Sequence, residues 1–401
     1  MNRHLKLQVV IGIFALIFLS WLFAFYIGDH FGQFHDLLGR RANLNNLNRT
    51  GNIYVPFKTE AFTYPPTAIA FFYPILLIPK HLLTFTWTLF SLAALCASLN
   101  LVLQNLRPQP VLSALRTSLV LTVMSAILAA PVLEGLFWGQ VGTFLLLAVV
   151  WEEVSESDVR GGVLIGLATA LKIYPGIFIL VFIIRRQWSR LFWALGTIAT
   201  LLLSSYVLWP TSTKWYFIHV VMGGEGAVHF QNSHAAANNG SFVAVLERFP
   251  FNFASISTIV QIIISVAVIA LSLLGGHRLW QRGMKLSSLL VMMMGSALAS
   301  PIAWDHYFVF VPLLLLVPFE VGFRTWFGRC FICVAALDVI PWWRTRVPSN
   351  TNFINTTIGF IAQSELCLTS FTLIIVSIIF GSISGHSQNY VRNEKVRLSK
   401  T

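Results

Sequence analysis

The residues best suited to acid–base chemistry lie in the polar stretch 28–65, which follows the first apolar segment of the chain. Asp29 stands at its start, Asp36 follows, and the stretch ends at Phe62-Thr63-Tyr64-Pro65-Pro66. A carboxylate within hydrogen-bond reach of a hydroxyl group can take its proton during nucleophilic attack. We therefore expect this stretch to hold a general base. The alternative is a water-exposed loop that ends in an aromatic anchor.

A lysine in apolar surroundings is the first candidate for binding an anion. Lys172 lies in Leu171-Lys172-Ile173-Tyr174-Pro175, near the middle of the apolar segment 161–184. A charged group inside a bilayer is costly and needs a partner or a role. We expect Lys172 to bind the phosphate of an anionic lipid beside a helix that is kinked at Pro175. A snorkelling or ion-paired lysine is the alternative interpretation.

A second long polar stretch, 210–254, carries His219, Asn239 and Arg248. Loops longer than about 15 residues in compact proteins are usually functional or disordered. This stretch and 28–65 are rich in Trp, His, Asn and Gly rather than in the Pro, Ser, Glu and Lys of disordered tails. We expect both to fold over the membrane surface as a lid.

A short turn, Ser300-Pro301-Ile302-Ala303-Trp304-Asp305-His306, brings an aspartate next to a histidine between two apolar segments. Such a pair at a helix start can move a proton near neutral pH. A histidine that is simply hydrogen-bonded is the alternative. Glu134 and Trp138-Gly139-Gln140 form a further polar set, which we expect on the cytoplasmic side or within the bilayer and to which we assign no role.

The composition indicates a polytopic membrane protein. Hydrophobic residues make up 56% of the 401 residues, charged residues make up 10%, and the mean hydropathy is +0.73. This leaves too little polar surface to cover a soluble globule. The net charge of +12 fits topology signals and anionic headgroups rather than nucleic acid. Cys330 and Cys333 have CxxC spacing but no second pair, so we expect buried thiols and no metal site.

We expect an all-α protein whose residues 1–401 form one integral membrane domain. A bilayer core of about 30 Å needs about 20 apolar residues per helix. On this scale twelve spans are predicted, at 7–27, 66–80, 83–105, 112–131, 138–151, 161–184, 190–209, 255–275, 286–301, 306–319, 327–341 and 357–381.

The basic segments predict the orientation. The N-terminus, residues 185–190 and the basic tail 385–401 fall on one side, so both termini are expected in the cytoplasm. The loops 28–65 and 210–254 and the acidic loop 152–158 are then expected outside it. The topology of 105–151 stays open.

Several of these segments together resemble glycosyltransferase family 87, a group of GT-C fold transferases that use polyprenyl-phosphate sugars. The group includes actinobacterial mannosyltransferases of phosphatidylinositol mannosides and lipoarabinomannan. The resemblance covers roughly residues 5 to 310. It is carried by the polar exit after the first span, Phe62-Thr63-Tyr64-Pro65-Pro66, Trp138-Gly139-Gln140, Leu171-Lys172-Ile173-Tyr174-Pro175, Asn239-Gly240-Ser241 with Arg248, and Ser300-Pro301-Ile302-Ala303-Trp304-Asp305-His306.

The resemblance implies an inverting transfer with an aspartate of the first outer loop as base. Asp29 is the natural candidate, with Asp305 and Asp36 in reserve. The family's acid usually stands four residues before an aromatic residue, a place that His30 holds before Phe34, so Asp29 is displaced by one. The other assigned residues are His306 with Asp305 for catalysis, Lys172, Arg248 and Tyr64 for the donor phosphate, and Gln33, His219 and Asn239 for acceptor or loop contacts.

We therefore predict a mannosyltransferase of the plasma membrane that uses polyprenyl-phosphate mannose and forms an α linkage on a lipid-linked glycan outside the cytoplasm. Its partners are the donor, the acceptor and membrane lipids, with no nucleic acid. No cofactor or metal is expected, because phosphate is an activated leaving group and no DxD-like pair is present. The alternatives are an arabinofuranosyltransferase using a polyprenyl-phosphate pentose, a twelve-span secondary transporter or flippase, and a non-catalytic membrane scaffold.

Overall fold

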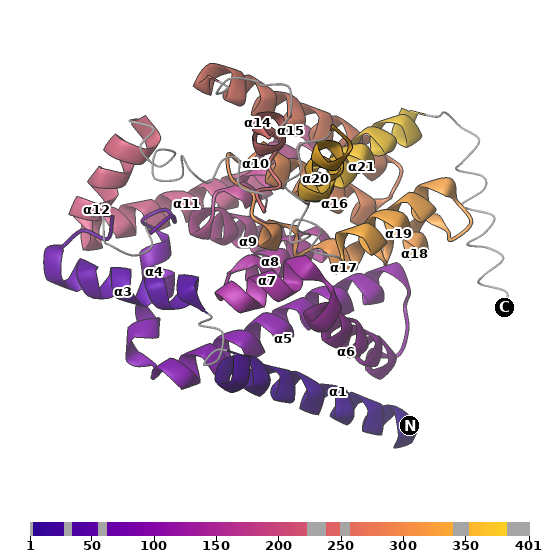
Figure 1. The fold of residues 1–401 in the computed structure, drawn as a ribbon, viewed down its shortest axis with the longest axis horizontal. Helices are drawn as coiled ribbons and strands as arrows, with labels where there is room; N and C mark the ends of the chain where they lie inside the picture. The colour runs from indigo at the N-terminus through magenta and orange to yellow at the C-terminus, as the bar shows by residue number, and fades with distance from the viewer. Residues whose placement is uncertain are drawn as a thin grey trace. The chain divides into compact units, whose positions relative to one another are not determined.

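The structure is a computed structural model that describes residues 3–27, 34–54, 62–222, 238–248, 257–339 and 353–382. These residues form helices joined by mostly short connections (Figure 1). Within the described ranges no strand is formed, and a single isolated bridge pairs Asn239 with Trp304. The predicted all-helical class is therefore confirmed.

Six of the described helices are long and apolar enough to cross a membrane. They cover His4–Tyr26, Lys80–Leu106, Val111–Leu128, Trp188–Leu208, Thr258–Gln281 and Glu365–Ser382. Several of the other predicted spans correspond to shorter apolar helices, such as Lys285–Ala299. The prediction of twelve spans is not confirmed.

Contacts between Cα atoms divide the chain into two compact units. The first contains residues 1–101, 109–127 and 132–232, and the second contains 102–108, 128–131 and 233–401. The helices that begin in the first unit are α1 (Arg3–Trp21), η1 (Leu22–Ile27), α3 (His35–Thr50), α4 (Ala68–Phe72), η2 (Tyr73–Leu77), α5 (Lys80–Leu106), α6 (Val111–Leu128), α8 (Gly142–Val154), α9 (Asp158–Leu171), η3 (Tyr174–Gly176), α10 (Ile177–Ile184), α11 (Trp188–Leu208), α12 (Pro210–Trp215) and η4 (Tyr216–Met222).

The second unit holds most of the later helices. They are α14 (Phe242–Glu247), α15 (Thr258–Gln281), α16 (Lys285–Ala299), η5 (Asp305–Phe308), α17 (Val311–Leu314), α18 (Val317–Val321), α19 (Trp326–Asp338), α20 (Phe353–Gln363) and α21 (Glu365–Ser382), while α7 (Ala130–Trp138) begins in this unit and continues into the first. Its core is formed by α15, α16 and α21, where small residues permit close approach. A Cβ atom on Gly295 of α16 would lie 2.1 Å from the hydroxyl oxygen of Ser272 on α15.

Helices α9 and α11 pack closely against each other and run in the same direction. A Cβ atom on Gly162 would lie 2.4 Å from the carbonyl oxygen of Arg190, and one on Gly166 would lie 2.7 Å from that of Ala194. These glycines therefore permit a separation of the two backbones that a larger side chain would prevent. Because the contacts advance along both helices together, the C-terminal ends of α9 and α11 lie at the same end of the unit.

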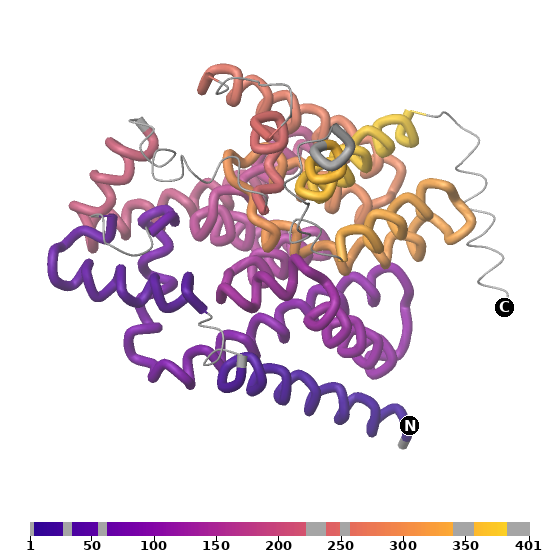
Figure 2. Tube along the Cα trace, viewed as in Figure 1, coloured from indigo at the N-terminus to yellow at the C-terminus, as the bar shows by residue number. Residues whose placement is uncertain are grey.

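The chain reverses direction between α9 and α11. The predicted single span 161–184 is wrong, because α9 ends at Leu171 and the short helices η3 and α10 follow. Figure 2 traces the chain in colours that follow the residue number. A Cβ atom on Gly176 would lie 3.3 Å from the Thr169 side chain, which places η3 back against the end of α9. Lys172 accordingly lies in the connection after α9 and not in the middle of a kinked helix.

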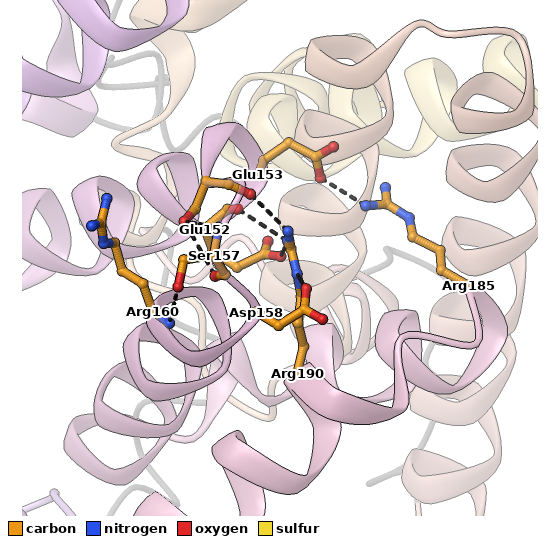
Figure 3. A network of polar contacts seen from close by, with 8 residues as sticks. Glu152, Glu153, Ser157, Asp158, Arg160, Arg185 and Arg190 are labelled. Carbon is orange, nitrogen blue, oxygen red and sulfur yellow. Dashed lines mark hydrogen bonds and ion pairs between the residues drawn. The ribbon is translucent and has the colours of Figure 1, made fainter.

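A network of ion pairs joins the other ends of these helices (Figure 3). Arg190 on α11 lies 2.5 Å from Glu152 at the end of α8 and 3.0 Å from Asp158 at the start of α9. Arg185, after α10, lies 2.8 Å from Glu153. The prediction that placed the acidic loop 152–158 and the basic loop 185–190 on opposite sides of the membrane is therefore wrong, since opposite charges in these loops are in direct contact.

Candidate active site

Helix α3, in the segment predicted as the first outer loop, carries a carboxylate and a guanidinium on one face. Asp36 and Arg40 are four residues apart, which places them one above the other on a helix, and their charged groups are 3.6 Å apart. The helix ends at Gly51, whose φ of 74° suits glycine and whose N–H bonds to the carbonyl of Leu47.

The Trp138-Gly139-Gln140 turn packs directly against α3. The backbone N–H of Phe34 donates to the carbonyl of Phe137 at 2.9 Å. Gly139 has a φ of +68°, and a Cβ atom there would lie 2.7 Å from the Cβ of Leu37. Only glycine suits both the left-handed backbone and this contact. The motif therefore lies beside the segment predicted as the first outer loop, whereas the sequence analysis placed the two apart.

Four side chains are joined in a closed ring by three hydrogen bonds and one ion pair, and we call them the polar ring: Asp36, Arg40, Tyr64 and Gln140. Arg40 donates to the Tyr64 hydroxyl at 2.8 Å, and that hydroxyl donates to Oε1 of Gln140 at 3.1 Å. The Gln140 amide donates in turn to the carboxylate of Asp36, which closes the ring. Arg40 also donates to the carbonyl of Gly139 at 2.8 Å. The ring joins three segments that are far apart in the sequence.

The polar ring has one exposed member. The side chains of Arg40 and Asp36 are 5% and 33% exposed, so water or a substrate can reach the carboxylate. Burial raises the pKa of Tyr64 to about 12, although Arg40 acts in the opposite direction. The Tyr64 hydroxyl therefore stays protonated at neutral pH and donates a hydrogen bond to Gln140. The ring holds an accessible carboxylate in a fixed orientation beside a buried guanidinium.

Lys172 lies next to the polar ring. Its ammonium nitrogen is 5.6 Å from the ring centroid of Tyr64 and 6.0 Å from that of Tyr174. Burial, and after it the charge of Arg40, lowers the pKa of Lys172 to about 7, with Asp36 acting in the opposite direction. The Thr67 hydroxyl donates to the carbonyl of Ala170 and so holds the Tyr64 segment against the end of α9. The result is a pair of cations, Lys172 and Arg40, beside one acid.

A stack of aromatic rings holds the backbone of Tyr64 in place. The Tyr54 hydroxyl donates to the carbonyl of Tyr64 at 2.7 Å, and the Tyr54 ring stacks on Trp215 at 5.1 Å. His219 stacks on the same tryptophan at 4.6 Å, and its Nδ1 is 3.0 Å from the Trp215 carbonyl. The structure thus places His219 in the aromatic stack, where it contacts Trp215, and outside the polar ring.

The second unit brings another group of predicted residues together. The side-chain oxygen of Asn239 accepts hydrogen bonds from the N–H groups of Ser241 at 3.0 Å and Ala303 at 2.9 Å. Arg248 donates to the Asn239 carbonyl at 2.9 Å and to the carbonyl of Gln363 at 3.0 Å. The Asn239-Gly240-Ser241 motif is therefore fixed against the turn that leads to Asp305.

The acid and the histidine of that turn are both buried. Asp305 is 4% exposed and His306 is 5% exposed, at the start of η5. Burial lowers the pKa of Arg248 to about 10, and the charge of Asp305 opposes this shift, so the guanidinium stays charged at neutral pH. Arg248 and Asp305 therefore form a second combination of a cation with an acid.

The predicted site residues divide into three groups. Tyr64 and Lys172 meet in the first unit, where His219 lies apart from them on Trp215, and Asn239, Arg248, Asp305 and His306 belong to the second. Asp29 and Gln33 lie outside the described residues. Among the residues that the structure does describe, no group of three His, Cys, Asp or Glu side chains is placed to hold a metal ion.

Sequence reasoning missed Arg40 and gave no role to Gln140. The signal for Arg40 was its spacing of four residues from Asp36, which indicates a shared helix face. The signal for Gln140 was its motif, which the sequence showed without the neighbours that the fold provides.

Comparison with known proteins identifies the family. The family model of glycosyltransferase family 87 matches residues 62–301, more than half of the chain, and this range includes Tyr64, Gln140 and Lys172. The chain therefore belongs to glycosyltransferase family 87 and is a glycosyltransferase. The resemblance seen in the sequence is confirmed.

Proteins from mycobacteria are similar to this chain. One from Mycobacterium tuberculosis (strain CDC 1551 / Oshkosh) is 28% identical over 304 residues, which cover 74% of this chain and 68% of the relative. One from Mycolicibacterium smegmatis is 25% identical over 323 residues, which cover 79% and 75%. Both are named polyprenol-phosphate-mannose-dependent alpha-(1-2)-phosphatidylinositol pentamannoside mannosyltransferase. No solved structure matches the chain.

Proposed function

We propose that this glycosyltransferase moves mannose from a polyprenyl-phosphate donor to a lipid-linked glycan acceptor, with inversion at the anomeric carbon and formation of an α linkage. The observation that supports this most directly is the polar ring with Lys172 beside it. An accessible acid and two cations meet there, and these are the groups that a transfer from a phosphate leaving group needs. The names of the mycobacterial relatives support mannose as the sugar.

In the proposed reaction an acceptor hydroxyl oxygen attacks the anomeric carbon of the donor sugar. The new C–O bond forms as the bond between that carbon and the phosphate oxygen breaks, and the electron pair leaves with the phosphate. The hydroxyl proton passes to a carboxylate. Asp29 remains the first candidate for this base, and Asp36 has the accessible position and the fixed orientation that a base requires.

The leaving phosphate gains negative charge, which nearby cations stabilise best where little water competes. Lys172 and Arg40 are the proposed ligands of this charge in the first unit. Tyr64 holds Arg40 in place and presents its ring to Lys172. In the second unit Arg248 is the proposed phosphate ligand, and Asp305 with His306 the proposed proton carriers. Gln33, His219 and Asn239 are proposed to contact the acceptor or to shape its loops.

The proposed orientation follows from the two ends of α9 and α11. The ion-pair network with Arg185 and Arg190 lies at their N-terminal ends, and Lys172 lies at the opposite end of α9. Basic loops are enriched on the cytoplasmic side of membranes. We infer that the network faces the cytoplasm and the polar ring faces outward, in the plasma membrane. The extracytoplasmic loops 28–65 and 210–254 and cytoplasmic termini belong to the same proposal.

The proposal is tested by reconstituting the purified protein in lipid nanodiscs with radiolabelled polyprenyl-phosphate mannose and a phosphatidylinositol mannoside acceptor. We expect a labelled product whose new linkage is α by NMR spectroscopy. Asp29→Asn and Asp36→Asn separate the two candidate bases, because only the true base should lose about 100-fold or more in kcat. Asp305→Asn tests the proton carrier proposed in the second unit, and Asp158→Asn, in the ion-pair network, is the matched control.

The outcomes separate the rival functions. Transfer from a polyprenyl-phosphate pentose but not from the mannose donor would replace mannosyltransferase by arabinofuranosyltransferase. Absence of transfer from either donor, together with flux of a solute across proteoliposomes, would favour a transporter. Full activity in both Asp29→Asn and Asp36→Asn would exclude the first loop as the source of the base.

A further inference from the structure

A groove on the surface of the first unit lies outside the polar ring. It has a volume of about 360 Å³ and is lined by residues of α11 together with residues of α12 and η4. The lining side chains include Leu203, Tyr206, Phe217 and Ile218, all of them exposed. The volume falls within the range of small-molecule pockets, about 300–1,000 Å³. Four exposed apolar side chains around one hollow suit a hydrocarbon chain.

A single cation completes the groove. Lys214 belongs to its lining, and its ammonium nitrogen lies 5.8 Å from the ring centroid of Tyr206. No acid is among the lining residues. The lysine can lay its apolar stem along the groove and place its charge at the end. The groove therefore suits a ligand with an apolar chain and an anionic head.

The groove lies at the same height as Lys172 along the packed helices. Gly166 of α9 contacts Thr197 of α11, and Lys172 and Leu203 each follow six residues later. At the rise of an α-helix Leu203 is about 9 Å beyond this contact, and Leu171, the last residue of α9 before Lys172, is about 7.5 Å beyond it. The groove is therefore at the end of the unit that holds the polar ring and far from the ion-pair network.

The short helix α12 links the groove to the polar ring. Lys214 lines the groove, and its neighbour Trp215 stacks on Tyr54, whose hydroxyl holds the backbone of Tyr64. A ligand in the groove would thus lie against an element that positions the ring. This continuity favours the lipid substrate of the site over a bulk membrane lipid as the occupant.

We propose that this groove binds a polyprenyl phosphate, with isoprene units against Leu203, Phe217 and Ile218 and the phosphate at Lys214. The identity of this lipid rests on the proposed function. Most of the lining is apolar, so the groove selects the isoprene chain and the phosphate and accepts the carrier with or without its sugar. It is a separate binding position for the carrier as it approaches or leaves the polar ring.

The test is photolabelling of the full-length protein in neutral phosphatidylcholine nanodiscs. The probe is an isoprenyl phosphate with a diazirine on its chain, and labelled peptides are mapped by mass spectrometry. We expect labels within 202–218, competed by unlabelled polyprenyl phosphate but not by the same amount of phosphatidylglycerol. Leu203→Trp fills the groove and should reduce labelling at least fivefold. Leu195→Trp, on the same helix and also exposed, is the matched control and should leave labelling unchanged.

Lys214→Gln tests the phosphate contact separately. Labelling by the isoprenyl phosphate probe should fall about tenfold, while labelling by the uncharged isoprenol probe should not change. The proposal is overturned if labels spread evenly over exposed helices, if phosphatidylglycerol competes equally well, or if Leu203→Trp and Leu195→Trp behave alike. Because labelling requires no sugar transfer, its failure leaves the mannosyltransferase proposal standing, and a failed transfer assay leaves the labelling result intact.

Discussion

Replacing Gly139 by alanine tests whether the position of α3 controls catalysis. The new Cβ would lie 2.7 Å from the Cβ of Leu37, whereas ordinary contact begins at 3.4 Å. The helix or the turn must therefore move by about 0.7 Å, because a Cβ atom cannot rotate away. Misplacement by about 1 Å can cost 100-fold in rate. We expect Gly139→Ala to lower kcat/KM between about 10-fold and 100-fold.

A matched control separates this displacement from backbone strain. Gly51 has a φ of +74°, close to the +68° of Gly139, but nothing lies within 4 Å of its Cβ position. The left-handed backbone should cost either alanine variant about 1–2 kcal/mol. We expect Gly51→Ala to show a similar loss of thermal stability in detergent with nearly wild-type kcat/KM. Normal activity in Gly139→Ala, or an equal loss in Gly51→Ala, would refute the reasoning.

Three further predictions concern the polar ring, Lys172 and the ion-pair network. Tyr64→Phe removes the hydroxyl between Arg40 and Gln140 and should lower kcat roughly 10-fold while the protein stays folded; unchanged kinetics would show that the ring is not needed. The pKa of Lys172 is about 7, so its ammonium form, which binds phosphate, is lost as pH rises through 7. The donor KM should rise above pH 7, up to about tenfold per pH unit, and Lys172→Met should abolish this dependence; the same profile in both proteins would contradict it. Arg190→Met leaves buried Glu152 without its arginine and should destabilise the protein by about 3–5 kcal/mol in SDS unfolding, more than Glu152→Gln does; equal effects would argue against a buried charge.

The sequence predicted the helical class and the motifs because both are local properties. Apolar runs such as 80–106 are long enough to be recognised one by one. The predicted partnership of Tyr64 with Lys172 is consistent with the contact between the Lys172 ammonium and the Tyr64 ring. Their assignment to a phosphate site stays a prediction.

The reversal of the chain between α9 and α11 could not be read from hydropathy. One long apolar run looks the same whether it crosses the membrane once or turns back at Lys172. The basic residues at 185–190 contact acids of the loop 152–158. Counting lysines and arginines alone therefore placed these two loops on opposite sides of the membrane, which is wrong. The same count separated Gln140 from the first polar stretch, whose Asp36 and Tyr64 it contacts.

The ion-pair network also constrains how the chain is made. Glu152 leaves the ribosome 38 residues before Arg190, the residue that pairs with it. At about 5–20 residues per second, the acid is synthesised about 2–8 s before its arginine. During that interval α9 and α10 are synthesised without the contact that later joins the end of α8 to the start of α11. Translation speed across this interval therefore sets how long the nascent enzyme carries an uncompensated acidic loop.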